Sequence, residues 1–484
     1  MEKLENDDVK WTVCDECKGV GTKRRKLSKK VRLNYQIALD QFEKSNGEGT
    51  VPVRPKGSSY VCPNCGGSGL VTITSNTLPY NENYPHVAII GGGIGGVALA
   101  VACLHRGIPF TLYERDSNFN ARSQGYGLTL QQASKAIQGL GIFTLNNGVV
   151  STRHVVHNTE GTIIGEWGNR KWIQEEAKGP AKRSNIHIAR QALRAALLEQ
   201  LGGHDKILWN HQLTDLKAVE DGGIQLSFTV NGEVINTKAD LVVGADGIRS
   251  SVRRMLIGED AAPLRYLDCI VILGICPLNA LQGVESPLLD SATVFQTANG
   301  NERIYMMPYT ADAIMWQLSF PIPENEAKAL SALGQQALKA EACKRTQWHH
   351  PIPQIMAATP QGNISGYPVY DREMLTTDLL ANSGSATLIG DAAHPMSPFK
   401  GQGANQALLD AIALARAISK ECRTPQWKES GLRATLSTEF EAAMLARSAV
   451  KVKDSAAAAQ FLHSDVVLHE SNSPRGRCGK RSDS

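Results

Sequence analysis

Residues 86–96 read HVAIIGGGIGG, and this stretch decides the fold that the chain is expected to adopt. The apolar run at 87–90 predicts a strand, and Gly91, Gly93 and Gly96 form a G-x-G-x-x-G pattern directly after it. In that context the first glycine permits a tight turn, the second lets the backbone approach a pyrophosphate, and the third lets helix and strand pack closely. The pattern therefore predicts a dinucleotide at the N-terminus of the following helix, where unpaired N–H groups favour phosphate.

The segment after the glycines extends this pattern into the beginning of a βαβ unit. We expect a helix at 95–106 and a second strand at 110–114, which ends at Glu114. A carboxylate at that place can accept hydrogen bonds from both hydroxyls of an adenosine ribose. An ordinary tight turn is the alternative for a glycine run alone, and the motif by itself does not separate FAD from NAD. Five glycines within residues 91–96 would make a poor membrane helix, so no membrane span is expected here.

Two later segments indicate that the dinucleotide is FAD. Residues 390–405 read GDAAHPMSPFKGQGAN between a strand expected at 386–389 and a helix expected at 404–418. Asp391 at the strand end can bind a ribityl hydroxyl, and the glycine-opened helix directs N–H groups toward the negatively charged edge of a reduced flavin. The alternative is a plain connection whose aspartate caps the helix. Residues 244–253 read GADGIRSSVR after another short strand, and a surface turn is the alternative there.

In this order, the three segments resemble those of the class A flavoprotein monooxygenases, the aromatic-ring hydroxylase or p-hydroxybenzoate hydroxylase-like family. The resemblance covers about residues 85–417 and implies an α/β fold, in which a Rossmann-like FAD-binding domain carries an inserted antiparallel-sheet substrate domain. Arg190 matches the family's FAD-contacting arginine. Arg115 and Arg122 are further candidates for contact with FAD, and the alternative is that each is an ordinary solvated charge at the surface. The residues that the motifs and the resemblance assign to FAD are Gly91, Gly93, Ile94, Gly95, Gly96, Glu114, Arg115, Arg122, Arg190, Asp246, Gly247, Gly390, Asp391, Pro398, Gly401, Gln402, Gly403, Ala404 and Asn405.

The resemblance also implies a reaction. In the family, NAD(P)H reduces tightly bound FAD, oxygen adds at flavin C4a, and the hydroperoxide transfers one oxygen to an electron-rich substrate, here an aromatic or polycyclic small molecule. Because the cofactor carries the chemistry, His394 beside Asp391 is assigned a structural role rather than that of an acid or base. The chain has one G-x-G-x-x-G, so we expect transient binding of NADH or NADPH without a second Rossmann domain.

The substrate is expected between the flavin and the sheet domain. An apolar stripe in such a domain is more often core than pocket. The candidate wall residues are Met307, Tyr309, Trp316 and Phe399. Residues 398–403 (PFKGQG) also resemble the corresponding stretch of the tetracycline-inactivating monooxygenases.

Two alternatives to a monooxygenase stay open at this point. One is an FAD-dependent reductase on the same scaffold, and the other is an interaction protein in which FAD is only structural. A halogenase on this scaffold is disfavoured, because residues 167–173 read WGNRKWI and lack the W-x-W-x-I spacing of that group.

Two copies of C-x-x-C-x-G-x-G lie near the N-terminus, at residues 14–21 (CDECKGVG) and 62–69 (CPNCGGSG). Two thiolate pairs can close one tetrahedral zinc site, and the glycines let backbone N–H groups turn toward the sulfurs. The pattern resembles half of the cysteine-rich domain of DnaJ chaperones, and such a module is also a candidate docking site for a protein partner. A redox-active pair or loose thiols are the alternatives. The expected structural zinc ligands are Cys14, Cys17, Cys62 and Cys65.

The composition bounds the class of protein. The first residues contain no apolar leader, and six of the ten cysteines lie singly, which favours an intracellular, cytoplasmic protein over a secreted one. The net charge is only +4, with basic residues gathered at 23–32 and near the C-terminus, which argues against a nucleic-acid platform. The basic run at 23–32 could be a targeting signal or a contact for an acidic partner, with a solvated face as the alternative.

These features predict an order of parts along the chain. The expected parts are a cysteine-rich zinc-binding module at 1–75, a linker at 76–84, the first part of the FAD-binding domain at 85–261, a sheet-rich substrate domain at 262–370, the return segment of the FAD-binding domain at 371–425, a C-terminal helical region at 426–470 and a disordered tail at 471–484.

Overall fold

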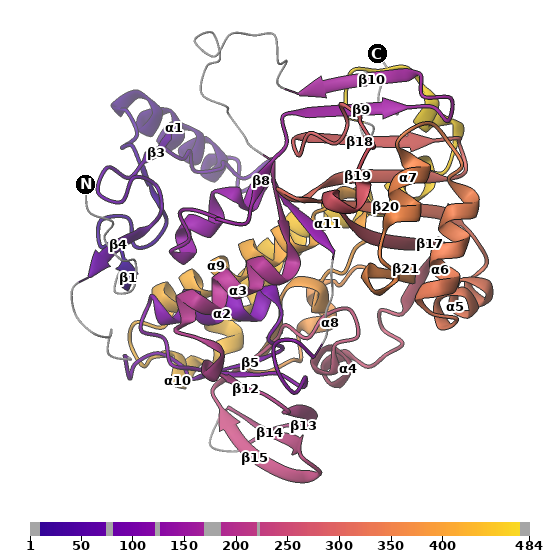
Figure 1. Ribbon diagram of the computed structural model, residues 1–484. Helices are drawn as coiled ribbons and strands as arrows, with labels where there is room; N and C mark the ends of the chain where they lie inside the picture. Colours follow the sequence, from indigo (N-terminus) through magenta and orange to yellow (C-terminus); the bar gives the residue numbers. More distant parts are fainter. Residues whose placement is uncertain (1–9, 74–80, 122–125, 169–184, 220–222, 475–484) are drawn as a thin grey trace, which may run out of the picture. The chain divides into compact units, whose positions relative to one another are not determined.

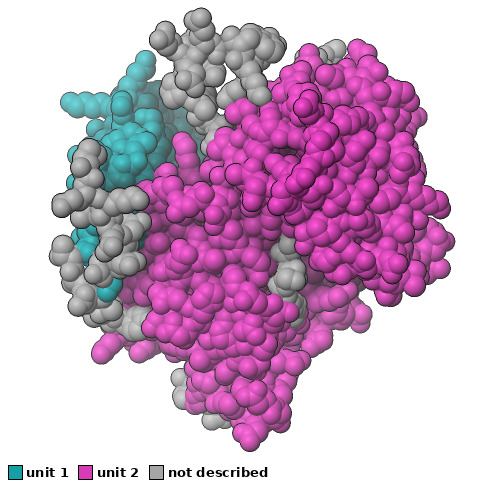
Figure 2. Space-filling view, viewed as in Figure 1, with its two compact units in different colours: residues 1–78 teal, residues 79–484 magenta. Residues whose placement is uncertain are grey.

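The computed structural model describes residues 10–73, 81–121, 126–168, 185–219 and 223–474 of the chain. Contacts divide the chain into two compact units, Met1–Leu78 and Pro79–Ser484 (Figure 2). The division falls inside the linker predicted at 76–84, most of which lies outside the described residues.

The larger unit is built on a five-stranded parallel sheet with the strand order β12-β6-β5-β16-β22. Its central strand β5 is fully buried, as expected for a parallel strand covered on both faces. The predicted strands at 87–90, 110–114 and 386–389 are all present within one residue of their expected ends. The α/β class is confirmed. The five strands are β5 (Val87–Ile90), β6 (Phe110–Tyr113), β12 (Ile207–Leu208), β16 (Leu241–Gly244) and β22 (Ala386–Leu388).

Helix α2 (Ile94–Leu104) packs against both α3 (Arg190–Leu201) and α9 (Gly403–Glu421), and the three helices lie over one face of this sheet (Figure 1). Helices α2 and α9 are in contact at Gly95, where a Cβ would lie at an ordinary van der Waals distance of 3.4 Å from the Cβ of Ala407 on α9. The other face is covered by an antiparallel sheet, in which the Phe228 ring stacks on Tyr113 at 4.4 Å. That sheet consists of β13 (Gln212–Ala218), β14 (Ile224–Val230) and β15 (Glu233–Ala239).

A second, seven-stranded sheet has the order β10-β9-β18-β19-β20-β17-β21. Five of its strands lie near the predicted range 262–370: β17 (Leu264–Pro277), β18 (Thr293–Ala298), β19 (Arg303–Thr310), β20 (Ala313–Pro321) and β21 (Ile364–Arg372). The sequence-based boundary is wrong at the other edge, because β9 (Arg153–His157) and β10 (Ile163–Gly168) come from the segment assigned to the FAD-binding domain. The β9–β18 pair is parallel and the remaining pairs are antiparallel, so the sheet is mixed.

One face of the seven-stranded sheet forms a closed core with three helices. The three helices are α5 (Glu324–Ala332), α6 (Gln335–Arg345) and α7 (Ile352–Ala358) (Figure 1). Trp316, Phe295 and Phe320 are fully buried in this core. Successive side chains of a strand point to opposite faces, so the residues between them form the other face. Residues of that other face line the cavity described below.

The remaining elements of this unit connect the two sheets. Helix α3 begins at Arg190, because residues 186–189 pair as strand β11 (Ile186–Ala189) between β7 (Gly127–Leu130) and β8 (Val149–Val150). The short helix α4 (Ser251–Ile257) follows β16, and the long helix α11 (Thr438–Phe461) lies in the predicted C-terminal helical region. Ser471 and Asn472, at the beginning of the predicted disordered tail, hydrogen-bond to β10.

Over residues 10–73, the smaller unit contains two short antiparallel strand pairs and one helix. β1 (Lys10–Val13) pairs with β4 (Leu70–Ile73), and β2 (Thr22–Arg24) pairs with β3 (Ser59–Val61). Helix α1 (Lys29–Lys44) begins after the N-cap residue Ser28 and has no buried residue. The last residues of the basic run at 23–32 therefore lie in the first turn of this helix.

Among the described residues, no helix combines the length and apolar character needed to cross a bilayer.

Candidate active site

A cavity of about 1530 Å³ opens at the carboxyl ends of the parallel strands and extends along the seven-stranded sheet. Its walls include Gly91 and Gly93 after β5, Ala245 after β16 and Gly390 after β22 at one end, and residues of β18, β19 and β20 at the other. Ligands of open α/β sheets bind outside the carboxyl ends of the strands. A drug-sized pocket occupies about 300–1,000 Å³, so this cavity has room for a dinucleotide and a second molecule.

The glycine turn after β5 is shaped by two close backbone approaches. Gly91 has a φ of 109°, and a Cβ there would lie 2.6 Å from the carbonyl oxygen of Ala245. A Cβ on Gly96 would lie 1.9 Å from the carbonyl oxygen of Gly91, so that residue packs the helix and does not line the cavity. A Cβ on Gly93 would meet only Arg190 Nη2, at 3.8 Å. The turn therefore leaves space for a ligand beside Gly93, as a pyrophosphate requires.

Glu114 lies against the same turn. Its carboxylate accepts hydrogen bonds from the backbone N–H groups of Gly92 at 2.7 Å and Asp116 at 3.0 Å. A carboxylate has about four acceptor positions, so two remain for ribose hydroxyls. Glu114 and its neighbour Arg115 both line the cavity, whereas Arg122 lies outside the described residues.

Two arginines on the first turns of α3 hold the glycine turn and the adjoining wall. The Arg190 guanidinium lies 5.6 Å over the Tyr126 ring, and both residues line the cavity. Arg194 donates from Nε to the carbonyl oxygen of Gly92 at 2.7 Å and lies 5.0 Å over the Phe119 ring. The sequence reasoning did not select Arg194 as a site residue, although its position four residues after Arg190 places it on the same helix face.

The turn after β22 presents Asp391 to the cavity. The Asp391 side chain is exposed to the cavity yet enclosed by the surrounding protein, which raises the pKa of its carboxyl by desolvation, while His394 and Arg190 oppose that shift. Within the described part of the chain its carboxylate accepts no hydrogen bond from another side chain, so it is available to a ligand hydroxyl. His394 faces away from the cavity and is buried against Asp410 of α9, at 2.7 Å, which supports the structural role expected for it.

Helix α9 begins at the cavity wall after a turn with Gly401 in the left-handed region, at a φ of 58°. Asn405 is expected from the sequence to contact FAD, but its side chain does not line the cavity. Its Oδ1 accepts the N–H groups of Gln131 and Ala133, and its Nδ2 donates to the Gly401 carbonyl oxygen. The residue therefore fixes the loop around the helix N-terminus, where free N–H groups face the cavity. The expected contacts that line the cavity around this helix and α2 are Ile94, Gly95, Pro398, Gly401, Gln402, Gly403 and Ala404.

The segment after β16 supplies a third part of the wall. Asp246 and Gly247 both line the cavity. The Asp246 carboxylate accepts the Ser251 N–H at 2.7 Å and the Ser250 hydroxyl, so it caps α4. Burial raises the pKa of the Asp246 carboxyl, against the effect of these hydrogen bonds. The alternative of a plain surface turn does not describe this segment, because it lies beside β5 and β22.

The four candidate substrate-wall residues do not all border the cavity. Met307 and Phe399 line the cavity. Tyr309 packs behind Met307 outside the cavity lining. The interpretation of Trp316 as a wall residue is wrong, because the alternation along β20 turns its side chain into the helix-covered core, where its Nε1 donates to Thr359 Oγ1 at 2.8 Å.

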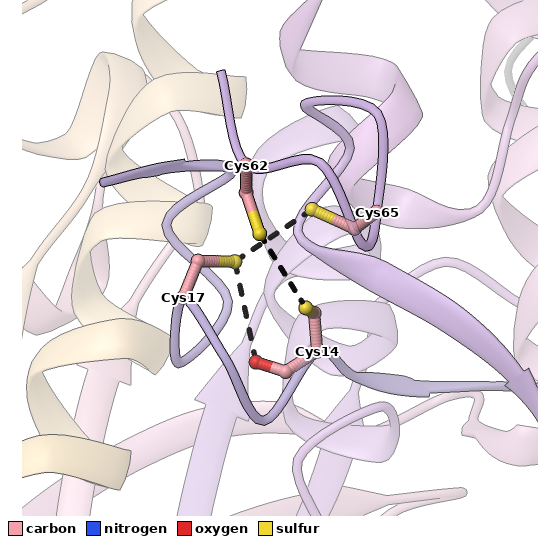
Figure 3. Close-up of side chains that lie close together, drawn as sticks. All are labelled: Cys14, Cys17, Cys62 and Cys65. Atoms are coloured by element: carbon pink, nitrogen blue, oxygen red, sulfur yellow. Dashed lines mark hydrogen bonds between the residues drawn. The ribbon is translucent and has the colours of Figure 1, made fainter. Parts of the chain in front are cut away.

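The four cysteines of the smaller unit converge to one point (Figure 3). Their sulfurs all lie within 4.8 Å of one another, with 3.9 Å between Cys14 and Cys62 and 3.7 Å between Cys17 and Cys65. The two sequence copies are related by an approximate two-fold arrangement. The Cys14 N–H donates to the Gly69 carbonyl oxygen and the Cys62 N–H donates to the Gly21 carbonyl oxygen, each at 2.9 Å.

Backbone donors also reach the sulfurs in matching positions. The Gly21 N–H lies 3.2 Å from Cys17 Sγ and the Gly69 N–H lies 3.3 Å from Cys65 Sγ. Both glycines have positive φ and a Cβ on either would overlap the opposite loop. Four sulfurs with N–H donors are the donor set of a structural zinc site with four cysteine ligands.

Comparison with known proteins identifies the larger unit. Residues 84–434 match the model of the FAD binding domain family. The chain belongs to this family of FAD-dependent monooxygenases. It is 30% identical to an aurachin C monooxygenase/isomerase from Stigmatella aurantiaca over 343 residues, which cover 70% of this chain and 82% of that protein. It is 25% identical to a chloroplastic zeaxanthin epoxidase from Oryza sativa subsp. japonica, with 72% of this chain and 50% of that longer protein covered.

Solved structures share the fold of the larger unit. The structure of Klebsiella pneumoniae HpxO complexed with FAD and uric acid superimposes with a TM-score of 0.63 and 20% identity, covering 80% of this chain and 90% of that one. The tetracycline destructase Tet(51) superimposes with a TM-score of 0.55 and 20% identity, covering 81% of this chain and 96% of that one. The family membership and the cradle formed by Gly93, Glu114 and the α9 N-terminus agree that this chain binds FAD.

Proposed function

We propose that this protein uses NADH or NADPH and molecular oxygen to hydroxylate an aromatic or polycyclic small molecule. The observation that carries the proposal is that a single cavity joins the dinucleotide turn at Gly91 to the partly apolar sheet face at Met307 and Met315. A flavin held at one end of such a cavity would present its ring to a molecule bound at the other. When bound, FAD supplies the oxygen-transfer chemistry.

The protein's own residues would hold the cofactor in three places. Gly93 and Glu114 would receive the pyrophosphate and the adenosine ribose, because they border the open side of the glycine turn. Asp391 would accept a hydrogen bond from a ribityl hydroxyl. The N-terminus of α9, opened by Gly401 and Gly403, would stabilise negative charge on the pyrimidine edge of the reduced ring.

The side chains at the sheet end would position the substrate and exclude water. Met307, Met315 and Phe399 provide apolar surface there. Water exclusion strengthens the electrostatic contacts within the site and protects reactive species from hydrolysis. The reductant would bind transiently, since the chain carries one dinucleotide motif and Glu114 at its end serves the FAD ribose.

The test is single-turnover kinetics of the FAD-loaded protein. Anaerobic NADH and NADPH are each mixed with the protein in the presence of a panel of phenols, and the bleaching of the flavin absorbance is followed. Labelled dioxygen is then admitted and the products are analysed by mass spectrometry. We expect rapid reduction by one nucleotide and one labelled oxygen atom in the product. Reduction followed only by hydrogen peroxide, with every phenol tested, would favour the alternative of an FAD-dependent reductase.

We also propose that the smaller unit holds one structural zinc ion between Cys14, Cys17, Cys62 and Cys65. The converging sulfurs and the matched N–H donors of Gly21 and Gly69 support this proposal. The described residues of unit Met1–Leu78 include few buried apolar side chains besides these cysteines, so a metal would supply stability that its core does not. Reduced thiols of this kind suit the cytoplasm, which we propose as the location.

Metal analysis of the purified full chain tests the zinc proposal. We expect one zinc per chain, and replacement by cobalt should give the strong sulfur-to-metal charge-transfer bands of a tetrahedral thiolate site. The double variant Cys62→Ser, Cys65→Ser should lose both the metal and these bands. A disulfide detected between the pairs in the freshly isolated protein would contradict the proposal and favour a redox-active role.

A further inference from the structure

A row of polar side chains crosses three strands on the cavity face of the seven-stranded sheet. Gln296 on β18 lies opposite Tyr305 on β19, and Tyr305 lies opposite Gln317 on β20. Arg303 precedes Tyr305 by two residues and shares its face of the strand. All four residues line the cavity, at the end distant in the fold from the glycine turn. Sequence reasoning did not single out any of them, because an isolated polar residue within a β-type run has no local signature.

The Arg303 guanidinium is buried without a negative partner. The residue is 5% exposed, and its Nε donates to Gln296 Oε1 at 2.9 Å. In the part of the chain that the structure describes, its side-chain partner is the neutral amide of Gln296 and no carboxylate pairs with it, although Asp454 lines the same cavity. Burial lowers the pKa of Arg303 to about 10, so the group remains charged at neutral pH. Buried charges in proteins are normally paired, because desolvation of a lone ion is costly.

The neighbouring amides are also left with unused donors. The Nε2 atoms of Gln296 and Gln317 are both buried and have no hydrogen-bond partner among the described residues. The Gln296 amide cannot reverse to remove this defect, because its Oε1 already accepts from Arg303. The sheet face therefore offers a cation and two N–H donors and lacks the acceptor that would satisfy them.

We propose that this group is the recognition site for a carboxylate on the substrate, so that the protein acts on aromatic acids. Because Nε is occupied by Gln296, the two Nη atoms are left as an end-on fork, whose geometry matches the two oxygens of a carboxylate. The amide donors of Gln296 and Gln317 would add neutral hydrogen bonds on either side. The aromatic body of the acid would then lie along Tyr305 and Met307. The inference rests on the proposed function, because it takes the sheet end of the cavity as the substrate site.

Among the described residues, an aromatic ring is a further neighbour that could account for the buried Arg303. Its guanidinium lies 5.0 Å over the Tyr305 ring, and a cation–π contact contributes about 0.5–2 kcal/mol. Within the described residues, that contact leaves both Nη atoms without acceptors, so it does not explain why a permanent charge is placed at the wall of a cavity. A carboxylate ligand explains the arginine and both amides together.

The test uses matched acid and amide pairs with the FAD-loaded full chain. The probes are benzoate and benzamide, 4-hydroxybenzoate and 4-hydroxybenzamide, and 2-aminobenzoate and 2-aminobenzamide. Kd is measured from the change in flavin absorbance at neutral pH without NADH or NADPH. We expect at least one acid to bind about tenfold or more tightly than its amide, because a charge-assisted hydrogen bond contributes about 1.5–3 kcal/mol.

Variants assign the preference to its residues. Arg303→Met should abolish the preference for the acid, and Arg303→Lys should keep part of it, since lysine retains the charge but not the fork. Arg254→Met, at an exposed position on α4, is the matched control and should behave as the parent. If Arg303→Met does not fold, Gln317→Leu replaces it and should weaken binding of the acid more than binding of the amide, because a hydrogen bond to a charged acceptor is the stronger one.

The inference is overturned if no acid binds more tightly than its amide, or if Arg303→Met keeps the preference. It is also overturned if Arg303→Met instead loses FAD, which would assign the arginine to the cofactor. Failure of the proposed function looks different. Acid binding that depends on Arg303 without any oxygen incorporation would contradict the monooxygenase reaction alone, and hydroxylation of neutral phenols independent of Arg303 would contradict this inference alone.

Discussion

Asp410 Oδ2 lies 2.7 Å from His394 Nε2 and accepts the Gly390 N–H at 2.8 Å, so one buried carboxylate fixes the turn that carries Asp391. Burial by itself would lower the pKa of His394, but the neighbouring Asp410 carboxylate outweighs burial and raises this pKa above its ordinary value. Arg447 from α11 binds the other carboxylate oxygen, and the aspartate is fully buried. Three separate segments of chain thus meet behind the cofactor cavity at a single side chain.

Replacing Asp410 should therefore damage both stability and FAD binding. We expect Asp410→Asn to lower the free energy of unfolding by about 3–5 kcal/mol, because it leaves Arg447 and His394 without their negative partner. The FAD content of the purified protein should also fall. Glu421→Gln on the same helix is the control, since its pair with exposed Lys420 should contribute less than about 1 kcal/mol. Equal urea-unfolding curves for the two variants would contradict the role assigned to Asp410.

The glycine turn predicts different outcomes for neighbouring alanine substitutions. Gly96→Ala should prevent correct folding of the turn, because its Cβ would lie 1.9 Å from the Gly91 carbonyl oxygen. Gly93→Ala should fold with a Tm close to that of the parent, since its Cβ faces the open side of the turn, but it should bind FAD at least about tenfold more weakly through the lost approach of the pyrophosphate. Gly362→Ala, where a Cβ meets nothing, is the control. Titration of the apoprotein with FAD measures the difference.

Met307 and Trp316 should separate substrate contact from core packing. Trp316→Ala should reduce the free energy of unfolding by about 3–5 kcal/mol, because it empties a fully buried site over Gly274. Met307→Ala should change the KM for a substrate while altering stability less, because Met307 borders the cavity. Thermal unfolding and steady-state kinetics on both variants provide the comparison. A larger KM effect from Trp316→Ala than from Met307→Ala would reverse the assignment of the two faces.

His187 should contribute to loss of stability in acid. Burial lowers the pKa of His187 to about 4, from an ordinary value near 6.5, while its ring nitrogens contact Thr129 and Ser151 hydroxyls at 3.0 and 2.8 Å. A histidine with a depressed pKa in the folded state stabilises the fold fully above about pH 6.5, and this contribution is lost as the pH falls toward 4. In His187→Asn the slope of unfolding free energy against pH in that window should be smaller by up to about 1.4 kcal/mol per unit. Identical slopes for parent and variant would contradict a contribution of His187 to the loss of stability in acid.

Removal of zinc should unfold the smaller unit and leave the larger one folded. The two units are separately compact, and the cysteine sulfurs form the centre of the smaller one. We expect a chelator to make residues 1–78 sensitive to protease while the FAD absorbance of the holoenzyme persists. Gly69→Ala should have a similar effect, because its Cβ would lie 2.4 Å from the Gly19 carbonyl oxygen. Release of FAD in step with zinc would contradict the independence of the two units.

The sequence by itself determined the features that depend on neighbours in the chain. The turn at Gly91, Gly93 and Gly96, the strand and helix around it, and the paired cysteines are local patterns, because backbone conformation and metal-ligand spacing are set within a few residues. For the same reason the three cofactor segments could be placed on strand ends before their distances were known. The order of those segments was sufficient to indicate the family.

Only the tertiary structure decided which side chains meet across the fold. Trp316 and Gln317 are adjacent in sequence, yet Trp316 is buried in the core and Gln317 faces the cavity. The alternation of side chains along a strand separates them onto two faces, but only the tertiary structure decides which face the helices cover. Asn405 became a loop-fixing residue, and β9 joined a sheet formed mostly by residues more than a hundred positions later. The lone charge of Arg303 was equally invisible in the sequence, since whether a charge is paired depends on the distances between segments that folding brings together.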